Sequence, residues 1–278
     1  MYKTILVPLD GSPRAECILD IAGELASRAG AQLDLVHVST RSAAQSSQRD
    51  TYLDAVARRL ADKWHIRTTA TIVDDERFEP RLDVAGALFQ FACDRQADLV
   101  IMARFGRAKL VRMWLTSVSE HMIRWCPVPV LLWRYGNSAP EPGSLAAIRR
   151  IIVPLDGSRV AEGVLDHAAK LQRILNAELC LIRVITPSDQ TSASGQARAY
   201  LDEIAATLIA RGVAAQGYTL QADSISPAIL AYASQAPGDM IAMSTYGYGG
   251  IARILLGSVA SDVLDKATVP VMLFRPAI

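Results

Sequence analysis

The sequence predicts an α/β protein of two tandem, doubly wound, five-stranded parallel sheets. Three observations carry this prediction. Short β-branched and apolar runs alternate with amphipathic, helix-like stretches along the 278 residues. The segment Val7–Ser12, VPLDGS, recurs as Val153–Ser158. Hydrophobic residues make up 51% of the chain and aromatic residues only 6%, which is typical of the aliphatic core of parallel sheets buried on both faces.

The repeat indicates a duplicated domain. Its offset is 146 residues at the VPLDGS segment (153 minus 7) and 141 residues where the VPV of 128–130 recurs at 269–271 (269 minus 128). This period is longer than the roughly 20 to 50 residues of solenoid repeats, and about 150 residues per domain also predicts two domains. We therefore expect a first domain at 1–134, a linker with several Gly and Pro residues at 135–148, and a second domain at 149–278.

In the first copy, Lys3–Leu9 is apolar and β-branched, which predicts a buried strand. A helix is expected next, with Ser12 as its N-cap, Pro13 at its first position and Gly30 as its end. The other expected strands of this copy are 32–38, 67–73, 98–103 and 128–133, and the other expected helices are 48–64, 80–95 and 116–125.

The second copy repeats this order of elements. Its expected strands start at Arg149, Glu178, Val213, Asp239 and Val269, and its expected helices start at Ser158, Gln196, Ser226 and Ser258. Strictly alternating strands and helices imply right-handed crossovers and a doubly wound sheet. In such sheets ligands bind beyond the carboxyl ends of the strands where the winding reverses, here between the first and fourth strands of a copy.

The stretch that follows the fourth strand of the second copy predicts a phosphate site. Small residues stand at Ser244, Gly247 and Gly257, where a backbone has to approach a ligand closely, and Gly257-Ser258 opens a helical pattern. Unpaired amides and the positive end of the dipole at a helix N-terminus favour an anion. Ser258 is expected to be the N-cap and to lend its hydroxyl.

Asp156 and Pro154 stand at the end of the first strand of the second copy, beside the expected crevice. A carboxylate at Asp156 can accept hydrogen bonds from a ribose hydroxyl or a base amino group, and the alternative is a turn bond to its own helix. Pro154 removes a ladder donor, which either leaves an edge open for a base or only ends the strand. For Asp10 in the first copy the alternatives are those given for Asp156: contact with a ligand or a turn bond to its own helix.

The first copy differs at the phosphate stretch, where Thr116-Ser117 replaces Gly257-Ser258. If the site needs a positive φ or a close backbone approach, Thr116 costs about 1 kcal/mol or more and obstructs a phosphate. The segment 109–114 is also bulkier than its counterpart, while Arg112 and Arg253 occupy equivalent loop positions, either balancing phosphate charge or solvated. We expect the second copy to bind nucleotide and the first to bind weakly or not at all.

Several other classes of function lack support in the sequence. The net charge of +1 does not favour nucleic acid, and no apolar run approaches the roughly 18 residues of a membrane span. The four cysteines form no close pair and the four histidines have no ligand spacing, so buried thiols in a reducing compartment and no metal site are expected. A P-loop, a complete dinucleotide fingerprint and a nucleophile elbow are missing, so no catalytic residue is assigned.

These motifs resemble the universal stress protein family over nearly the whole chain. VPLDGS opens each half, and the family's pattern of Gly, two residues, Gly, nine residues and Gly-Ser or Gly-Thr corresponds here to Ser244, Gly247, Gly257 and Ser258, followed by Val259. In the first half the same positions are Ala103, Gly106, Thr116 and Ser117, so two of three glycines are missing.

The resemblance implies a Rossmann-like, adenine nucleotide α-hydrolase-like sheet with helices on both faces. It also implies ATP, alone or with Mg²⁺, on the second phosphate motif, with the adenine and ribose at Pro154, Asp156 and Val184 and with Met243 nearby. Family members pair through the fifth strand, so 128–133 and 269–274 are expected to form an internal pseudo-dimer, with a homodimer as a further option. The implied role is in stress tolerance, with ATP hydrolysis at most slow and of unknown purpose.

Three hypotheses follow for the function. The first is a cytoplasmic ATP-binding stress protein in which bound ATP alters the contacts of the protein; the N-terminus enters a strand at once and shows no signal peptide. The second is a nucleotide-free scaffold or chaperone-like module that works through the pseudo-dimer surface. The third is an ATP-consuming ligase or adenylating enzyme, for which no acceptor site or catalytic base is recognisable.

Overall fold

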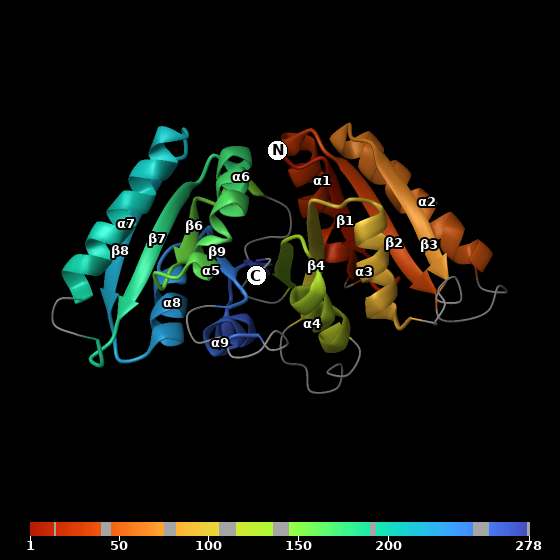
Figure 1. Ribbon diagram of the computed structural model, residues 1–278. Helices are drawn as coiled ribbons and strands as arrows, with labels where there is room; N and C mark the ends of the chain where they lie inside the picture. The colour runs from red at the N-terminus through yellow and green to blue at the C-terminus, as the bar shows by residue number, and fades with distance from the viewer. Residues whose placement is uncertain are drawn as a thin grey trace. The chain divides into compact units, whose positions relative to one another are not determined.

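The computed structural model describes residues 1–13, 15–39, 46–74, 82–105, 115–135, 145–189, 193–246 and 256–276. The chain divides into two compact units, Met1–Leu145 and Ala146–Ile278. Each unit alternates strands with helices along the chain, as the labels in Figure 1 show. The predicted α/β class with a parallel sheet in each half is confirmed. The exact domain boundaries and the linker at 135–148 stay predictions, and residues 136–144 lie outside the described residues.

The first unit holds a five-stranded sheet in the order β3-β2-β1-β4-β5, with parallel pairing throughout. Its strands are β1 Thr4–Pro8, β2 Gln32–Ser39, β3 Thr68–Asp74, β4 Leu99–Phe105 and β5 Val130–Tyr135. Its helices are the 3-10 turn η1 Ala15–Ile18 and the α-helices α1 Leu19–Ala29, α2 Ser46–Trp64, α3 Val84–Asp94 and α4 Leu115–Trp125. The central strand β1 pairs with β2 on one side and β4 on the other, so the winding reverses there as predicted.

The second unit repeats this sheet in the order β8-β7-β6-β9-β10, again with parallel pairing. Its strands are β6 Arg150–Pro154, β7 Glu178–Ile185, β8 Ala215–Gln221, β9 Asp239–Ser244 and β10 Val271–Phe274. Its helices are the 3-10 turn η4 Leu145–Ala147, which spans the boundary, and α5 Arg159–Glu162, α6 Leu165–Leu175, α7 Ala193–Ala210, α8 Ile225–Ala233 and α9 Ser258–Lys266.

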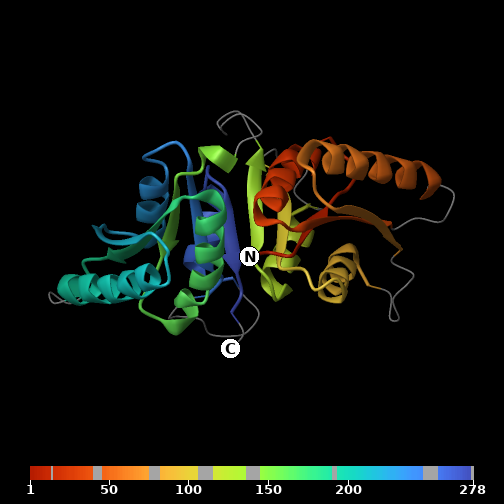
Figure 2. The same cartoon turned by 90° about the horizontal axis from the view of Figure 1, so that it is seen from above.

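Helices cover both faces of each sheet. In the first unit α1 and α2 lie on one face and α3 and α4 on the other, and in the second unit α6 and α7 lie opposite α8 and α9 (Figures 1 and 2). The strands between them are buried, as shown by Ile5 and Leu6 in β1 and Ile151 and Ile152 in β6, which are 0% exposed. Burial of apolar side chains on both faces explains why these runs contain few polar residues.

The start of the first helix differs from the prediction in both units. Ser12 accepts a hydrogen bond at its Oγ from the Ala15 amide (3.2 Å), but this bond caps the 3-10 turn η1, and the α-helix begins only at Leu19. A 3-10 turn is a common way to enter an α-helix because it tightens the first turn. In the second unit Ser158 is the N-cap of the short α5, and α6 starts separately at Leu165.

The end of α1 and the starts of β5 and β10 also follow from local chemistry. Gly30 ends α1 in the left-handed conformation with φ 65°, as predicted. The expected strands at Val128 and Val269 begin two residues later, because proline donates no amide to the ladder. The carbonyls of Pro129 and Pro270 still accept from Val100 and Ile241, at 3.0 and 2.9 Å.

Each unit holds a buried aspartate in an ion pair with a partly exposed arginine. In the first unit Asp34 is 0% exposed at its side chain and lies 2.8 Å from Nε of Arg95. In the second unit Asp239 is 0% exposed, and its two carboxylate oxygens accept from Nε and Nη2 of Arg150 at 2.8 and 2.6 Å. Such a carboxylate is stable in the interior only while its partner is present.

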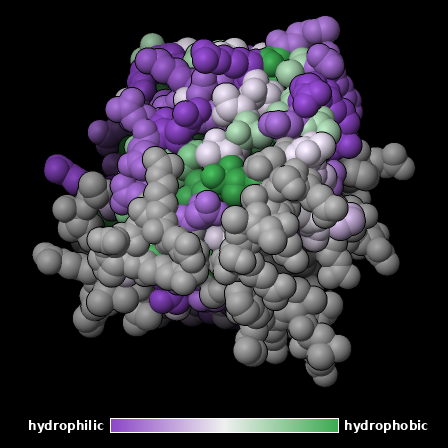
Figure 3. All heavy atoms as spheres, turned by 90° about the vertical axis from the view of Figure 1, so that its right-hand side faces the viewer, coloured by the Kyte–Doolittle hydropathy of each residue, from purple (hydrophilic) through white to green (hydrophobic). Residues whose placement is uncertain are grey.

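Hydrophilic side chains cover most of the described surface in the view of Figure 3, and a small hydrophobic area lies near its centre. Among the described helices, none combines the length and the apolar character that crossing a bilayer requires.

Candidate functional site

A pocket of about 800 Å³ opens at the carboxyl ends of β6, β7 and β9 in the second unit. The strands β6 and β9 are hydrogen-bonded neighbours, with Ile152 opposite Ile241, so the pocket lies where the winding of the sheet reverses. Its volume is within the roughly 300 to 1,000 Å³ of small-molecule sites. The predicted site residues that line it are Pro154, Asp156, Val184, Met243, Ser244, Gly257, Ser258 and Val259. The ninth, Gly247, lies outside the described residues.

The N-terminus of α9 forms one wall of this pocket. Gly257, with φ −58° and ψ 147°, is the N-cap, and Ser258 is the first helical residue, so the prediction that Ser258 is the N-cap was wrong. The amide of Ser261 already bonds to the Gly257 carbonyl at 2.8 Å. Among the described residues, the amides of Ser258, Val259 and Ala260 have no acceptor, as expected for the first turn of a helix.

Gly257 allows a close backbone contact and does not have an unusual φ. Its φ is negative, so a positive φ does not explain the glycine. Its amide donates to the Thr245 carbonyl at 2.8 Å, and an added Cβ would stand 3.1 Å from that same oxygen. Of the two reasons considered from the sequence, close backbone approach is therefore the one that applies. Leu256 is not among the residues that line the pocket.

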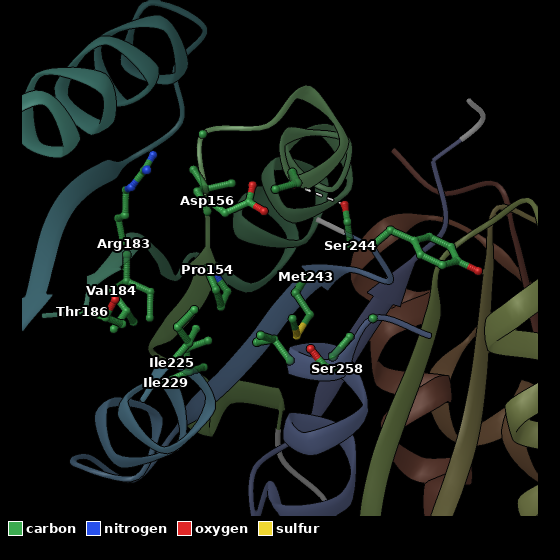
Figure 4. A pocket seen from close by; sticks show the side chains of 18 of the residues that line it. Pro154, Asp156, Arg183, Val184, Thr186, Ile225, Ile229, Met243, Ser244 and Ser258 are labelled. Atoms are coloured by element: carbon green, nitrogen blue, oxygen red, sulfur yellow. Dashed lines mark hydrogen bonds between the residues drawn. The ribbon is translucent and has the colours of Figure 1, made fainter. Parts of the chain in front are cut away.

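The loop after β6 carries Asp156 and forms the upper rim of the pocket in Figure 4. Its Oδ1 accepts from the Ser158 amide at 2.9 Å and from the Ser158 hydroxyl at 2.6 Å. The local turn bond considered as an alternative is thus present. It does not exclude a ligand, because a carboxylate has further lone pairs and Asp156 also faces the pocket.

The floor of the pocket is formed by buried residues of β9. Met243 and Ser244 are 6% and 4% exposed. The Ser244 hydroxyl donates to the Ala161 carbonyl at 3.2 Å, drawn as the dashed line in Figure 4. Ser244 therefore joins β9 to α5, and its small size leaves the strand end accessible from the pocket.

An apolar wall of three residues stands opposite α9, and the sequence interpretation missed two of them. Ile225 and Ile229 of α8 stand on one side of the pocket with Val184 of β7, while Met243 and Ser258 stand on the other (Figure 4). Ile225 is 43% exposed, although isoleucine is usually buried. The spacing of four residues that places both isoleucines on one helix face was visible in the sequence, but nothing there linked that face to β7.

A charged rim was missed as well. Arg183, Thr186, Ser188 and Asp189 line the pocket at and beyond the end of β7. The Thr186 amide and hydroxyl donate to Oδ2 of Asp189 at 2.6 and 3.0 Å. These bonds, with the nearby charge of Arg183, hold the pKa of Asp189 below its ordinary value.

The corresponding region of the first unit is described only in part. Gly106, Arg112 and, in the second unit, Arg253 lie outside the described residues. Ala103 lies in β4, and Thr116 and Ser117 lie in α4, which begins at Leu115. The predicted obstruction of a phosphate by Thr116 therefore stays a prediction.

The cysteines and histidines take no visible part in this pocket. All four cysteines are free thiols, and burial raises the pKa of Cys126 and Cys180 to about 11. In the part of the chain that is described, no group of three or more His, Cys, Asp or Glu side chains is arranged to hold a metal ion.

Comparison with known families gives a match in both halves. The model of the universal stress protein family matches residues 1–134 and again residues 147–275. A universal stress protein of Mycolicibacterium smegmatis is 24% identical over 189 residues, which cover 66% of this chain and 63% of that protein. One of Thermus aquaticus is 30% identical over 138 residues, covering 48% of this chain and 100% of that protein. The chain thus spans 63% and 58% of the lengths of the first two curated relatives.

Solved structures agree on the fold. A universal stress protein of Archaeoglobus fulgidus covers 99% of this chain and 98% of its own, with a TM-score of 0.76 and 20% identity. Another solved universal stress protein, with a TM-score of 0.40 and 21% identity, covers 49% of this chain and 98% of its own and is in complex with cAMP. The complex with cAMP is a finding about that protein.

Proposed function

We propose that this chain, which belongs to the universal stress protein family, binds one ATP in the pocket of its second unit. The bound nucleotide then alters the contacts that the protein makes in a stress response. The observation that carries the proposal is the row of three amides at the start of α9, on the wall of a pocket of about 800 Å³.

The start of α9 suits a triphosphate. The amides of Ser258, Val259 and Ala260 lack acceptors among the described residues, and the helix dipole adds partial positive charge at this end. Ser258 is exposed, so its hydroxyl can donate to a phosphate oxygen. The first turn of α9 contains no acidic residue that would repel the phosphates.

The opposite wall suits a nucleoside. Val184, Ile225 and Ile229 offer an apolar surface to a flat base, and base burial there removes apolar area from water. Asp156 stands between this wall and α9, where its carboxylate can accept from ribose hydroxyls. Pro154 and Met243 fill the space below, at the ends of β6 and β9.

The proposal is one of binding and assigns no catalytic residue. ATP enters it alone or with Mg²⁺, held through the phosphates. It includes a cytoplasmic location, where ATP is available, and an internal pseudo-dimer formed through β5 and β10. The first unit is proposed to bind nucleotide weakly or not at all.

Titration calorimetry with ATP tests the site, using Asp156→Ala and its counterpart Asp10→Ala. Both variants lose a bond from the amide of the serine two residues on, at 2.8 Å for Asp10 and 2.9 Å for Asp156, and Asp156→Ala also loses the bond from the Ser158 hydroxyl. We expect one ATP per chain and a loss of about 10- to 100-fold in Asp156→Ala, since a hydrogen bond to a charged group contributes about 1.5–3 kcal/mol. Asp10→Ala is expected to bind as the unchanged chain does.

Equal weakening in both variants would place the ATP elsewhere, and two ATP per chain would contradict the difference between the units. Absence of heat and of any thermal shift with millimolar ATP would reject nucleotide binding and favour a nucleotide-free scaffold.

A further inference from the structure

The side chain of Arg183 gives the pocket a second position that favours an anion, in addition to the amides at the start of α9. Arg183 lies next to Val184 near the end of β7, and the two side chains point to opposite faces of the strand. In Figure 4 the guanidinium points toward the loop that carries Asp156. Its Nη1 would be only 2.5 Å from a Cβ added at Gly157, so the glycine makes room for it.

This guanidinium makes no hydrogen bond or ion pair with any residue that the structure describes; its described contact is with the ring of Tyr200, 5.9 Å from Cζ to the centroid. The acidic side chains around it are each engaged locally. Glu162 accepts from the Tyr200 hydroxyl at 2.8 Å, Asp189 from Thr186 at 2.6 Å, and Asp156 from Ser158 at 2.9 Å. A guanidinium beside a pocket, with its donors unused by these neighbours, is suited to an anion.

Arg183 and the start of α9 lie on opposite sides of the pocket, as the labelled Arg183 and Ser258 show in Figure 4. Strand β6 lies between β7, which carries Arg183, and β9, which leads to α9. Neighbouring strands are about 4.8 Å apart, so the backbones of β7 and β9 are about 10 Å apart across the sheet, which favours two separate phosphate positions. Asp156, the proposed ribose contact, lies in the loop that follows the strand between them.

We propose that the site prefers an adenine nucleotide that carries a second phosphate on its ribose, at the 2′ or the 3′ position. This inference rests on the proposed function. The 5′-phosphates lie on the amides of α9, Asp156 accepts from the remaining ribose hydroxyl, and Arg183 pairs with the ribose phosphate. An arginine beside the ribose has this role in dinucleotide sites that accept a 2′-phosphate.

The first unit provides the contrast. At the position of Arg183 it has His37, whose Nδ1 lies 2.8 Å from the Leu9 carbonyl. An added Cβ at Gly11, the counterpart of Gly157, would meet nothing within 4 Å. The guanidinium and the space for it are therefore features of the second unit, and the preference belongs to that unit alone.

Calorimetry with three ligands tests the inference: AMP, adenosine 2′,5′-bisphosphate and adenosine 3′,5′-bisphosphate. We expect at least one bisphosphate to bind 10-fold or more tightly than AMP. In Arg183→Met the ratio is expected to fall to one or below, because Asp156 then repels the added phosphate. Arg183→Lys, which keeps the charge, should retain part of the ratio, and His37→Met should leave it unchanged.

The outcomes separate this inference from the proposed function. If ATP binds but neither bisphosphate binds more tightly than AMP, the role of Arg183 is overturned and the ATP site stands. If Arg183→Met keeps the full preference, the ribose phosphate is held by other groups and the inference is also overturned. If none of the four nucleotides binds, both proposals fail together.

Discussion

The two units of this chain share a fold and differ where a ligand would be held. Both have a parallel sheet whose central strand leads into an Asp-Gly-Ser turn, at Asp10–Ser12 and Asp156–Ser158. Both tie the following segment to the next helix through a tyrosine, Tyr52 to Glu16 at 2.5 Å and Tyr200 to Glu162 at 2.8 Å. These shared contacts hold the turn and the helices of each unit in place.

The differences lie near the end of the second strand and after the fourth strand of each unit. His37 stands where the second unit has Arg183, and Thr116 stands in α4 where Gly257 caps α9. Packing contacts have to be kept in both copies because each sheet needs them to fold. Side chains that face a pocket carry no such constraint, so one copy can lose a site and remain stable.

The buried ion pairs give the largest expected difference between the units. Asp34 also accepts from Thr69 and Gln32, at 2.7 and 3.2 Å, whereas Asp239 accepts only from Arg150 among the described side chains. We expect Arg150→Met to lower the free energy of unfolding by about 3–5 kcal/mol, because it leaves a buried charge uncompensated. Arg95→Met is expected to cost less, about 1–3 kcal/mol, because two donors remain.

Urea unfolding measures both costs. All four tryptophans lie in the first unit, at positions 64, 114, 125 and 133, so their fluorescence follows that unit while circular dichroism follows both. A larger loss in Arg95→Met than in Arg150→Met would show that Thr69 and Gln32 do not support Asp34.

Exchange of the residue before the phosphate helix tests the contrast in binding. Gly257→Thr gives the second unit the residue of the first and places a branched side chain against the Thr245 carbonyl, 3.1 Å from the new Cβ. We expect ATP affinity to fall about 30-fold, or about 2 kcal/mol by calorimetry. Thr116→Gly is the control, because it changes the first unit and should leave the affinity of the second unchanged; an unaltered affinity in Gly257→Thr would contradict the role of this glycine.

The turn glycines give the smallest effect. Gly11 and Gly157 have φ values of 81° and 85°, which alanine adopts only with strain. We expect Gly11→Ala and Gly157→Ala each to lower the free energy of unfolding by about 1 kcal/mol. Only Gly157→Ala displaces the Arg183 guanidinium, so only it should reduce the preference for a ribose bisphosphate over AMP. Matching ligand ratios in the two variants would show that the turn does not position Arg183.

Part of the candidate pocket could be predicted from the sequence. Pro154, Asp156, Val184, Met243, Ser244, Gly257, Ser258 and Val259 all line it. Pro154, Asp156, Ser244, Gly257 and Ser258 were found because the repeat and the glycine stretch mark both strand ends, and parallel strands bring their carboxyl ends to one edge. Val184, Met243 and Val259 came only from the family resemblance. Whether these residues bind ATP is the proposal that the calorimetry above addresses.

Arg183, Ile225 and Ile229 could not be found in the same way. Arg183 alternates with Val184 along one strand, and a strand pattern alone does not tell which of two adjacent side chains faces a ligand. The isoleucines follow a different strand, and only the packing of α8 beside β7 brings them to Val184.

The sequence by itself determined the duplicated α/β fold, the order of its elements and the strand ends that meet at the switch point, because hydrophobic periodicity and turn residues act locally. Only the tertiary structure decided that Gly257 and not Ser258 caps α9, that Gly257 lies in close contact with Thr245 and has no positive φ, and that Gly157 leaves space for a guanidinium from the next strand. These features depend on which backbones and side chains approach one another across the sheet, and distances between segments far apart in the chain are not encoded in local patterns.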